Sequence, residues 1–152
     1  WAPELTTAPA CRMLHQTPTP LDDQIRERFE RQPRRDTKPE LEIRRELHRR
    51  GFRFRLDARA SKSIRSRPDI VFTRARVAVF VDGCFWHRCP DHGTLPKNNH
   101  QWWSEKLCAN TERDARTTAT LKAEGWNVIR IWEHEPVNEA VDRVAAAVTA
   151  RR

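Results

Sequence analysis

Residues 77–92, with the sequence VAVFVDGCFWHRCPDH, constrain the fold of this chain more than any other stretch. They open with five apolar residues of high strand propensity, which predicts a buried strand. Gly83 ends that strand, and the residues around it combine cysteine, histidine, aspartate and aromatic side chains. Such a concentration of chemistry at the end of a strand is typical of a functional site rather than of packing.

Composition limits the kind of protein this is. The 152 residues suit one domain with its own core. With 29 Lys+Arg against 21 Asp+Glu, the net charge of +8 favours a polyanionic partner, above all nucleic acid. No apolar run reaches the roughly 18 residues of a membrane span and no signal peptide is apparent. The four cysteines, mixed with histidines, favour metal ligands over a secreted disulfide framework. We therefore expect a cytoplasmic, monomeric protein that does not enter a membrane.

Hydrophobic periodicity predicts a single α/β domain over residues 36–152, preceded by a basic, proline-containing arm over residues 1–35. The arm is either a disordered tail or a segment that folds along DNA. The expected elements are helices over residues 37–50, 101–124 and from 136 onward, and strands over residues 51–56, 70–72, 77–81 and 126–132. Together they predict a mixed central sheet flanked by helices. In the first helix, Thr37 at the N-cap and Glu40 three residues later form a capping box, which is a complete structural explanation of Glu40.

The spacing Cys84-x4-Cys89-x2-His92 predicts a metal site. Two thiolates and an imidazole this close together suit tetrahedral zinc, although unpaired buried thiols are the alternative. A structural zinc site needs a fourth ligand, and the candidates are His134, His87 and Cys108.

Two carboxylates, Asp69 and Asp82, bracket the predicted hairpin of residues 70–81. Carboxylate oxygens at strand ends bind Mg²⁺, and Mg²⁺ with a base such as His87 hydrolyses phosphodiesters. The plainer interpretation, solvated turn carboxylates, suits Asp82 better than Asp69, which lies between a proline and an apolar run.

Aromatic and basic residues suggest how DNA could be held. Phe85, Trp86, Trp102 and Trp103 would ordinarily pack in a core, but Phe85 and Trp86 lie on the irregular ligand-bearing loop, where aromatics can wedge between base steps. A second basic segment, residues 58–67, carries Arg59 and Arg65 and is either solvated or in contact with phosphates.

These residues resemble a known family. The resemblance is carried by Arg67-Pro68-Asp69, by residues 80–87 (FVDGCFWH), by Trp103-x2-Lys106-x3-Asn110-x3-Asp114, and by Gly125-Trp126 through Trp132-Glu133. They look like the very-short-patch repair (Vsr) endonucleases, bacterial DNA nickases specific for the T·G mismatches that arise when 5-methylcytosine deaminates. The resemblance covers residues 35–134.

The resemblance implies a restriction-endonuclease-like core that cuts the phosphodiester 5′ to the mispaired thymine. By position, it implies that Asp69 and the backbone carbonyl of Val81 bind Mg²⁺ and that His87 is the general base. Glu40 and Asp114 would hold metal-bound waters or orient the groups around them. The remaining implied roles are structural zinc binding by Cys84, Cys89, His92 and His134, intercalation by Phe85, Trp86 and Trp103, and DNA contacts by Lys106 and Asn110. Mismatch-repair proteins are candidate partners.

The chain also departs from the family pattern. Asp82 stands where a second catalytic histidine can occur, so we expect it to support His87 or a metal. Cys89 and His92 are in reverse order relative to some relatives, and His134 stands in place of a cysteine. Two other functions fit the same features: a nuclease of this fold without mismatch specificity, and a non-catalytic zinc-stapled DNA-binding module.

Overall fold

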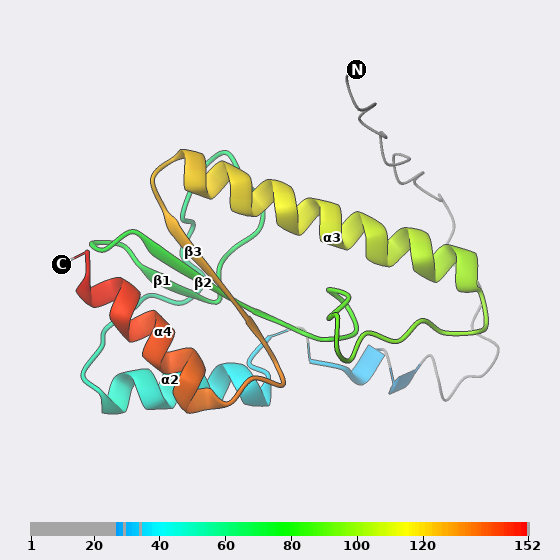
Figure 1. Cartoon of the computed structure of the whole chain (residues 1–152), viewed down its shortest axis with the longest axis horizontal. Helices are drawn as coiled ribbons and strands as arrows, with labels where there is room; N and C mark the ends of the chain where they lie inside the picture. The colour runs from blue at the N-terminus through cyan, green and yellow to red at the C-terminus, as the bar shows by residue number, and fades with distance from the viewer. Residues whose placement is uncertain (1–26, 29, 34, 152) are drawn as a thin grey trace, which may run out of the picture.

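The structure, a computed structural model, describes residues 27, 28, 30–33 and 35–151. Along the chain it contains α2 (Lys38–Arg49), β1 (Ile70–Phe72), β2 (Val77–Asp82), α3 (His100–Ala123), β3 (Asn127–Trp132) and α4 (Val137–Thr149) (Figure 1). The predicted arm over residues 1–35 lies mostly outside the described residues, and the division into an arm and a single domain stays a prediction. Among the described residues, no helix is long and apolar enough to cross a membrane.

The sheet is mixed, as expected, with the strand order β1-β2-β3. β1 and β2 form an antiparallel hairpin, and β3 runs parallel to β2. A parallel neighbour requires a crossover connection, which α3 supplies. The β2–β3 register pairs Val77 with Asn127 and Asp82 with Trp132. Both strands therefore end at the same edge of the sheet, where the predicted functional residues lie.

Side chains of β2 alternate between two buried clusters. Val77 and Val79 belong to the larger one, with residues of α2 and α4, whereas Ala78 and Phe80 pack with Leu121 of α3. Accordingly, α2 and α4 lie on one side of the sheet and α3 on the other (Figure 1). Because side chains alternate along a strand, Asp82 falls on the side of α3.

The start of α2 was predicted correctly, but its capping bonds differ from the expectation. Thr37 is the N-cap residue, yet its side chain does not bond to the backbone of the first turn. Its hydroxyl donates to Glu40 Oε1 (3.1 Å), and Glu40 Oε2 accepts from the backbone N–H of Asp36 (3.0 Å). Glu40 thus ties down the chain before the helix, and the reciprocal capping box is absent.

The strand predicted over residues 51–56 is wrong. That segment makes one isolated bridge, in which Arg55 and Val71 exchange N–H···O bonds of 2.9 Å. β1 has only three residues. In an antiparallel pair, alternate residues point their N–H and C=O groups away from the partner strand, so only the middle residue of β1 offers both groups to a strand on its other side. The rest of residues 51–56 therefore has no partner in β1. The alternation that suggested a strand has another cause: Phe52 and Phe54 pack against the larger core cluster while Arg53 and Arg55 stay exposed.

Candidate active site and metal centre

The loop that follows β2 is compact. The N–H groups of His87, Cys89 and Gly93 donate to the carbonyls of Gly83 (3.1 Å), Cys84 (2.9 Å) and Cys89 (2.8 Å). Glu133, just after β3, accepts the N–H of Cys84 (2.8 Å) and so joins the loop to the neighbouring strand. These bonds make the loop compact, and its side chains contribute to two separate groups of residues.

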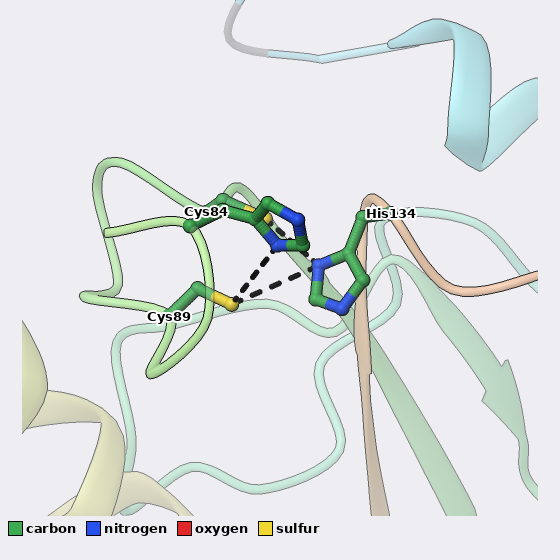
Figure 2. Close-up of side chains that lie close together, drawn as sticks. Cys84, Cys89 and His134 are labelled. Atoms are coloured by element: carbon green, nitrogen blue, oxygen red, sulfur yellow. Dashed lines mark hydrogen bonds between the residues drawn. The ribbon is translucent and has the colours of Figure 1, made fainter. Parts of the chain in front are cut away.

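The first group is the predicted metal centre. Cys84, Cys89, His92 and His134 each offer a ligand atom, and these atoms all lie within 4.8 Å of one another. The His134 Nδ1 atom is 3.1 Å from Cys84 Sγ and 3.7 Å from Cys89 Sγ, and His92 Nδ1 is 3.9 Å from Cys89 Sγ. Figure 2 shows the two cysteines of the loop facing His134, which comes from the segment after β3.

The four residues fit a tetrahedral metal ion. With metal–ligand bonds of about 2.0–2.3 Å, a tetrahedral site places ligand atoms roughly 3.3–3.8 Å apart. The measured separations bracket that range. Burial, reinforced by the adjacent Cys89 sulfur, raises the pKa of the Cys84 thiol to about 12. For Cys89, burial acts in the same direction, but hydrogen bonds from His92 and nearby backbone N–H groups outweigh it and lower the pKa. The pair therefore retains a proton that a cation would displace.

The sequence left a fourth ligand open among three residues, and these three lie at different places in the structure. His134 joins the cluster. Cys108 lies on α3, with its sulfur 3.9 Å from Glu112 Oε1, and the His87 ring binds Asp114. The cluster thus consists of two thiols and two imidazoles, a set that could hold a metal ion.

The second group is the predicted catalytic centre. His87 Nδ1 makes a short hydrogen bond to Asp114 Oδ2 of α3 and lies 3.8 Å from Asp82 Oδ1 at the end of β2. Burial disfavours a charged ring, but the hydrogen bond to Asp114 and the charges of both aspartates prevail and raise the pKa of His87. With Nδ1–H donated to Asp114, the neutral ring carries its lone pair on Nε2, the arrangement of a general base.

Sequence reasoning missed Arg130, which lies in β3 beside this centre. Its Nη1 donates to both oxygens of Asp82, at 3.0 and 2.9 Å. Asp82 is buried, with an exposed fraction of 5%. A signal was available: Arg130 interrupts the apolar run from Val128 to Ile131, and a charge in a strand core needs a partner.

Asp69 lies at the start of β1 and faces β2. Its Oδ2 accepts the backbone N–H of Val81 (2.7 Å). Burial raises the pKa of Asp69 to about 6, partly offset by the Val81 hydrogen bond and reinforced by the negative charges of Glu40 and Asp82. Three carboxyl groups from different elements therefore contribute to one region of negative potential.

Glu40 lies within that region with its own partners. Arg44 donates to it from one turn along α2 (3.1 Å), and the exposed fraction of Glu40 is 5%. The two interpretations of this residue are thus compatible: Glu40 organises the start of α2 and also acts electrostatically on Asp69.

The predicted aromatic wedges gather beside the catalytic centre, outside both core clusters. Phe85 contacts Trp86 and Trp103 edge-on, with ring centroids 5.1 and 5.4 Å apart. Trp102 packs against Trp103 at 4.9 Å. All four rings are half-buried, and Trp86 Nε1 donates to Gln32 Oε1 (3.3 Å).

The predicted polar DNA contacts lie on α3 and on the 58–67 segment. Asn110 Nδ2 donates to the Trp86 carbonyl (3.2 Å), which connects α3 to the loop, and Lys106 Nζ lies over the Trp102 ring at 5.4 Å. In the 58–67 segment, Ile64 is buried against α3 while Arg59 and Arg65 are exposed. The basic side chains are therefore carried by an anchored loop.

Comparison with known proteins identifies relatives of this chain. The family described as DNA mismatch endonuclease Vsr matches residues 22–91, which include Asp69 and the loop through Cys89. Type II nicking enzyme V.NaeI of Lentzea aerocolonigenes is 45% identical over 129 residues, covering 84% of this chain and 78% of that protein. Type II nicking enzyme V.XorIIP of Xanthomonas oryzae is 45% identical over 105 residues, covering 66% of this chain and 73% of that protein. DNA mismatch endonuclease Vsr of Escherichia coli is 36% identical over 102 residues, covering 65% and 62%.

These matches identify the chain as a DNA endonuclease. The chain belongs to the Vsr family of mismatch and site-specific nicking endonucleases. The resemblance inferred from the sequence motifs is confirmed, as is the expectation of an enzyme acting on DNA.

Proposed function

We propose that this enzyme is a Mg²⁺-dependent nickase that acts at T·G mismatches and hydrolyses the phosphodiester 5′ to the mispaired thymine. Such mismatches arise by deamination of 5-methylcytosine, so the nick would start very-short-patch repair. The observation that carries this proposal is the grouping of Asp69, the His87–Asp114 pair and the aromatic side chains at one end of the sheet, in a member of the Vsr family.

His87 is proposed as the general base. Asp114 accepts the Nδ1–H bond and sets the ring orientation, and Nε2 takes the proton from the attacking water. This role requires a neutral ring, because an imidazolium has no lone pair to accept the proton. The part that a lysine often plays in nucleases of this kind would here belong to His87.

The proposed Mg²⁺ site is Asp69 with the backbone carbonyl of Val81. Hard carboxylate and carbonyl oxygens are the ligands Mg²⁺ prefers, and the negative charges of Glu40 and Asp82 act on Asp69 from nearby. A bound Mg²⁺ would supply Lewis-acid stabilisation of the charge that develops on phosphate. Glu40, bonded to Arg44 and the Asp36 amide, is suited to hold water around this site.

Recognition is proposed to depend on intercalation by Phe85, Trp86 and Trp103. A T·G wobble pair stacks less well than a matched pair, so opening the step beside it costs less. Stacking on an aromatic side chain contributes about 1–3 kcal/mol per base, enough to turn that difference into selectivity. Lys106, Asn110, Arg59 and Arg65 would hold the DNA around the wedge, mainly through phosphates.

We propose that the Cys84–Cys89–His92–His134 centre binds structural zinc. All four ligand positions are filled by protein side chains, as in structural zinc sites, whereas catalytic zinc keeps an open position. The metal would join the loop after β2 to the segment after β3. By fixing the loop, it would also fix Trp86 and His87, which lie between its first two ligands.

Single-turnover nicking of duplexes with T·G, U·G or T·A at one site, in several flanking sequences and with or without Mg²⁺, tests this function. We expect nicking at T·G, on the thymine strand and only with Mg²⁺. Equal cleavage of T·A would favour a nuclease without mismatch specificity. Binding without nicking under any divalent ion would favour a non-catalytic module.

Recognition is tested separately with Trp86→Ala. It should narrow the gap in binding between T·G and T·A duplexes and leave the metal content unchanged. Full discrimination by Trp86→Ala and by Trp103→Ala would assign these rings to packing alone. With chromosomal DNA as substrate, the enzyme would act in the bacterial cytoplasm, where mismatch-repair proteins are candidate partners.

A further inference from the structure

Arg130 contacts both aspartates that lie beside the proposed general base. Beyond its bonds to Asp82, its Nη2 donates to the main-chain carbonyl of Asp114 (3.2 Å) and its Nε donates to Thr118 Oγ1 (3.0 Å). The guanidinium also lies over the Phe80 ring, 4.5 Å from the centroid. These contacts span β2, β3 and α3, the elements that surround His87.

His87 has two carboxylates within reach of the same nitrogen. Asp114 accepts the bond from Nδ1, and Asp82 Oδ1 lies 3.8 Å from it. A modest rotation of the ring would exchange one acceptor for the other and swing Nε2 away from its present direction. Arg130 Nη1 donates to both oxygens of Asp82, so its positive charge offsets that of Asp82 and weakens Asp82 as a competing acceptor.

We infer that Arg130 is a positioning residue for the endonuclease reaction: it holds Asp82 and Asp114 in place, so that His87 Nδ1 bonds to Asp114 alone and Nε2 faces the scissile phosphate. Asp82 is then the counter-charge of Arg130 rather than a ligand of the catalytic metal. This inference rests on the proposed role of His87 as base. The inference adds Arg130 and its pairing with Asp82 to the site. Motifs around the catalytic loop do not contain Arg130, because it is remote from that loop in sequence.

The rate test uses Arg130→Gln, Asp82→Asn and the double variant. In Arg130→Gln, a buried Asp82 loses its partner and competes for His87, and single-turnover nicking should fall about 10- to 100-fold, as for other misplaced catalytic groups. The double variant removes the competing charge together with its partner, so nicking should recover at least several-fold relative to Arg130→Gln. DNA binding should change little in all three.

A matched control is Arg50→Gln. Arg50 has a similar side-chain exposure (27% against 24% for Arg130) and also pairs with two carboxylates, Glu46 and Asp142, but on the side of the sheet covered by α2 and α4. Its nicking rate should stay at the wild-type value. A wild-type rate in Arg130→Gln, or a double variant no faster than Arg130→Gln, would overturn the inference.

The ring of His87 gives a second readout that needs no catalysis. Long-range ¹H–¹⁵N NMR of the wild type should show a single Nδ1–H tautomer, and Arg130→Gln should show a shifted or split ring signal. If Arg130→Gln does not fold, Arg130→Lys serves instead. A lysine keeps a charge for Asp82 but cannot also reach Thr118 and Asp114, so the same disturbance is expected at smaller amplitude. An undisturbed ring in the folded variant would refute the positioning role even if the proposed reaction proved wrong.

Discussion

The buried carboxyl group of Asp69 destabilises the folded protein at neutral pH, where this group is ionised. Burial raises its pKa to about 6 from an ordinary 3.8, so the fold favours the protonated form. The stability from that preference is fully present only below about pH 3.8 and is lost as pH rises through about 6, at a cost on the order of 3 kcal/mol. Metal-binding carboxylates are commonly held at such a cost, which the cation relieves when it binds.

Asp69→Asn should therefore be more stable than the wild type at pH 7.5, by up to about 3 kcal/mol, and close to it at about pH 3. Asparagine stays neutral and still accepts the Val81 N–H bond. Urea unfolding in Mg²⁺-free buffer measures this, with Asp142→Asn, an exposed carboxylate of α4, as control. Mg²⁺ should stabilise the wild type but not Asp69→Asn, whose nicking should fall about 100-fold or more while mismatch binding persists. A less stable Asp69→Asn at pH 7.5, or one that nicks normally, would assign Asp69 to the turn alone.

The pH dependence of nicking should report His87. Because its pKa is raised and the base must be neutral, the rate should increase with pH with a midpoint above the 6.5 that is usual for histidine. Asp114→Asn removes the hydrogen bond and the charge that favour the imidazolium, so its midpoint should move to lower pH. The rate at the plateau should also fall, because Asp114 orients the ring. An unchanged midpoint in Asp114→Asn would mean that another group limits the rate.

Among the elements, the loop between β2 and α3 carries three of the four residues of the Cys/His cluster. We expect about one zinc ion per chain, resistant to mild chelation, in the wild type. Cys89→Ala lacks one thiolate ligand. It should therefore lose the zinc, and its unfolding transition should no longer be cooperative. Cys108→Ala is the matched control because its sulfur lies outside the cluster, and it should keep the full zinc content. Zinc kept by Cys89→Ala, or lost from Cys108→Ala, would contradict the ligand set, as measured by elemental analysis.

The same loop requires a glycine at position 93. A Cβ there would lie 2.5 Å from the Cys89 carbonyl oxygen, which belongs to the backbone and cannot rotate away. Gly93→Ala should therefore displace the loop and weaken zinc binding. At Gly83 a Cβ would meet its nearest atoms at 3.7 and 3.9 Å, an ordinary contact, so Gly83→Ala should keep its zinc. Competition with a chromogenic chelator compares the two, and equal zinc affinity would show that the loop adapts.

For the whole molecule, the net charge of +8 predicts binding to DNA that weakens steeply with salt. Neutralising Arg59 and Arg65, exposed on the side of the sheet covered by α3, should lower the slope of log K against log salt by about 0.9 per lost phosphate contact. Arg49 of α2, 72% exposed on the opposite side of the sheet, is the control and should leave the slope unchanged when neutralised. Titrations by fluorescence anisotropy at several salt concentrations measure it. An unchanged slope in Arg59→Gln/Arg65→Gln would place the 58–67 segment away from DNA.

Much of this protein was determined by short-range patterns in its sequence. Helix periodicity and the glycines at 51 and 125 predicted the bounds of α2 and α3 and the start of α4 to within one residue, because each pattern reports on neighbours along one element. The spacing of Cys84, Cys89 and His92 predicted for the same reason that these three side chains lie close together. The motif around Asp69 and His87 was sufficient to indicate the family.

Only tertiary structure decided which distant residues meet. His134 rather than Cys108 completes the Cys/His cluster because β3 ends beside β2, which depends on the parallel register. The same register places Arg130 beside Asp82, 48 positions away, and α3 then brings Asp114 to His87. Residues 51–56 alternate in the manner of a strand but do not form one, because β1 is too short to pair with them. Local sequence sets what each element can be, whereas strand register and helix placement arise from packing the whole core, and the catalytic geometry depends on both.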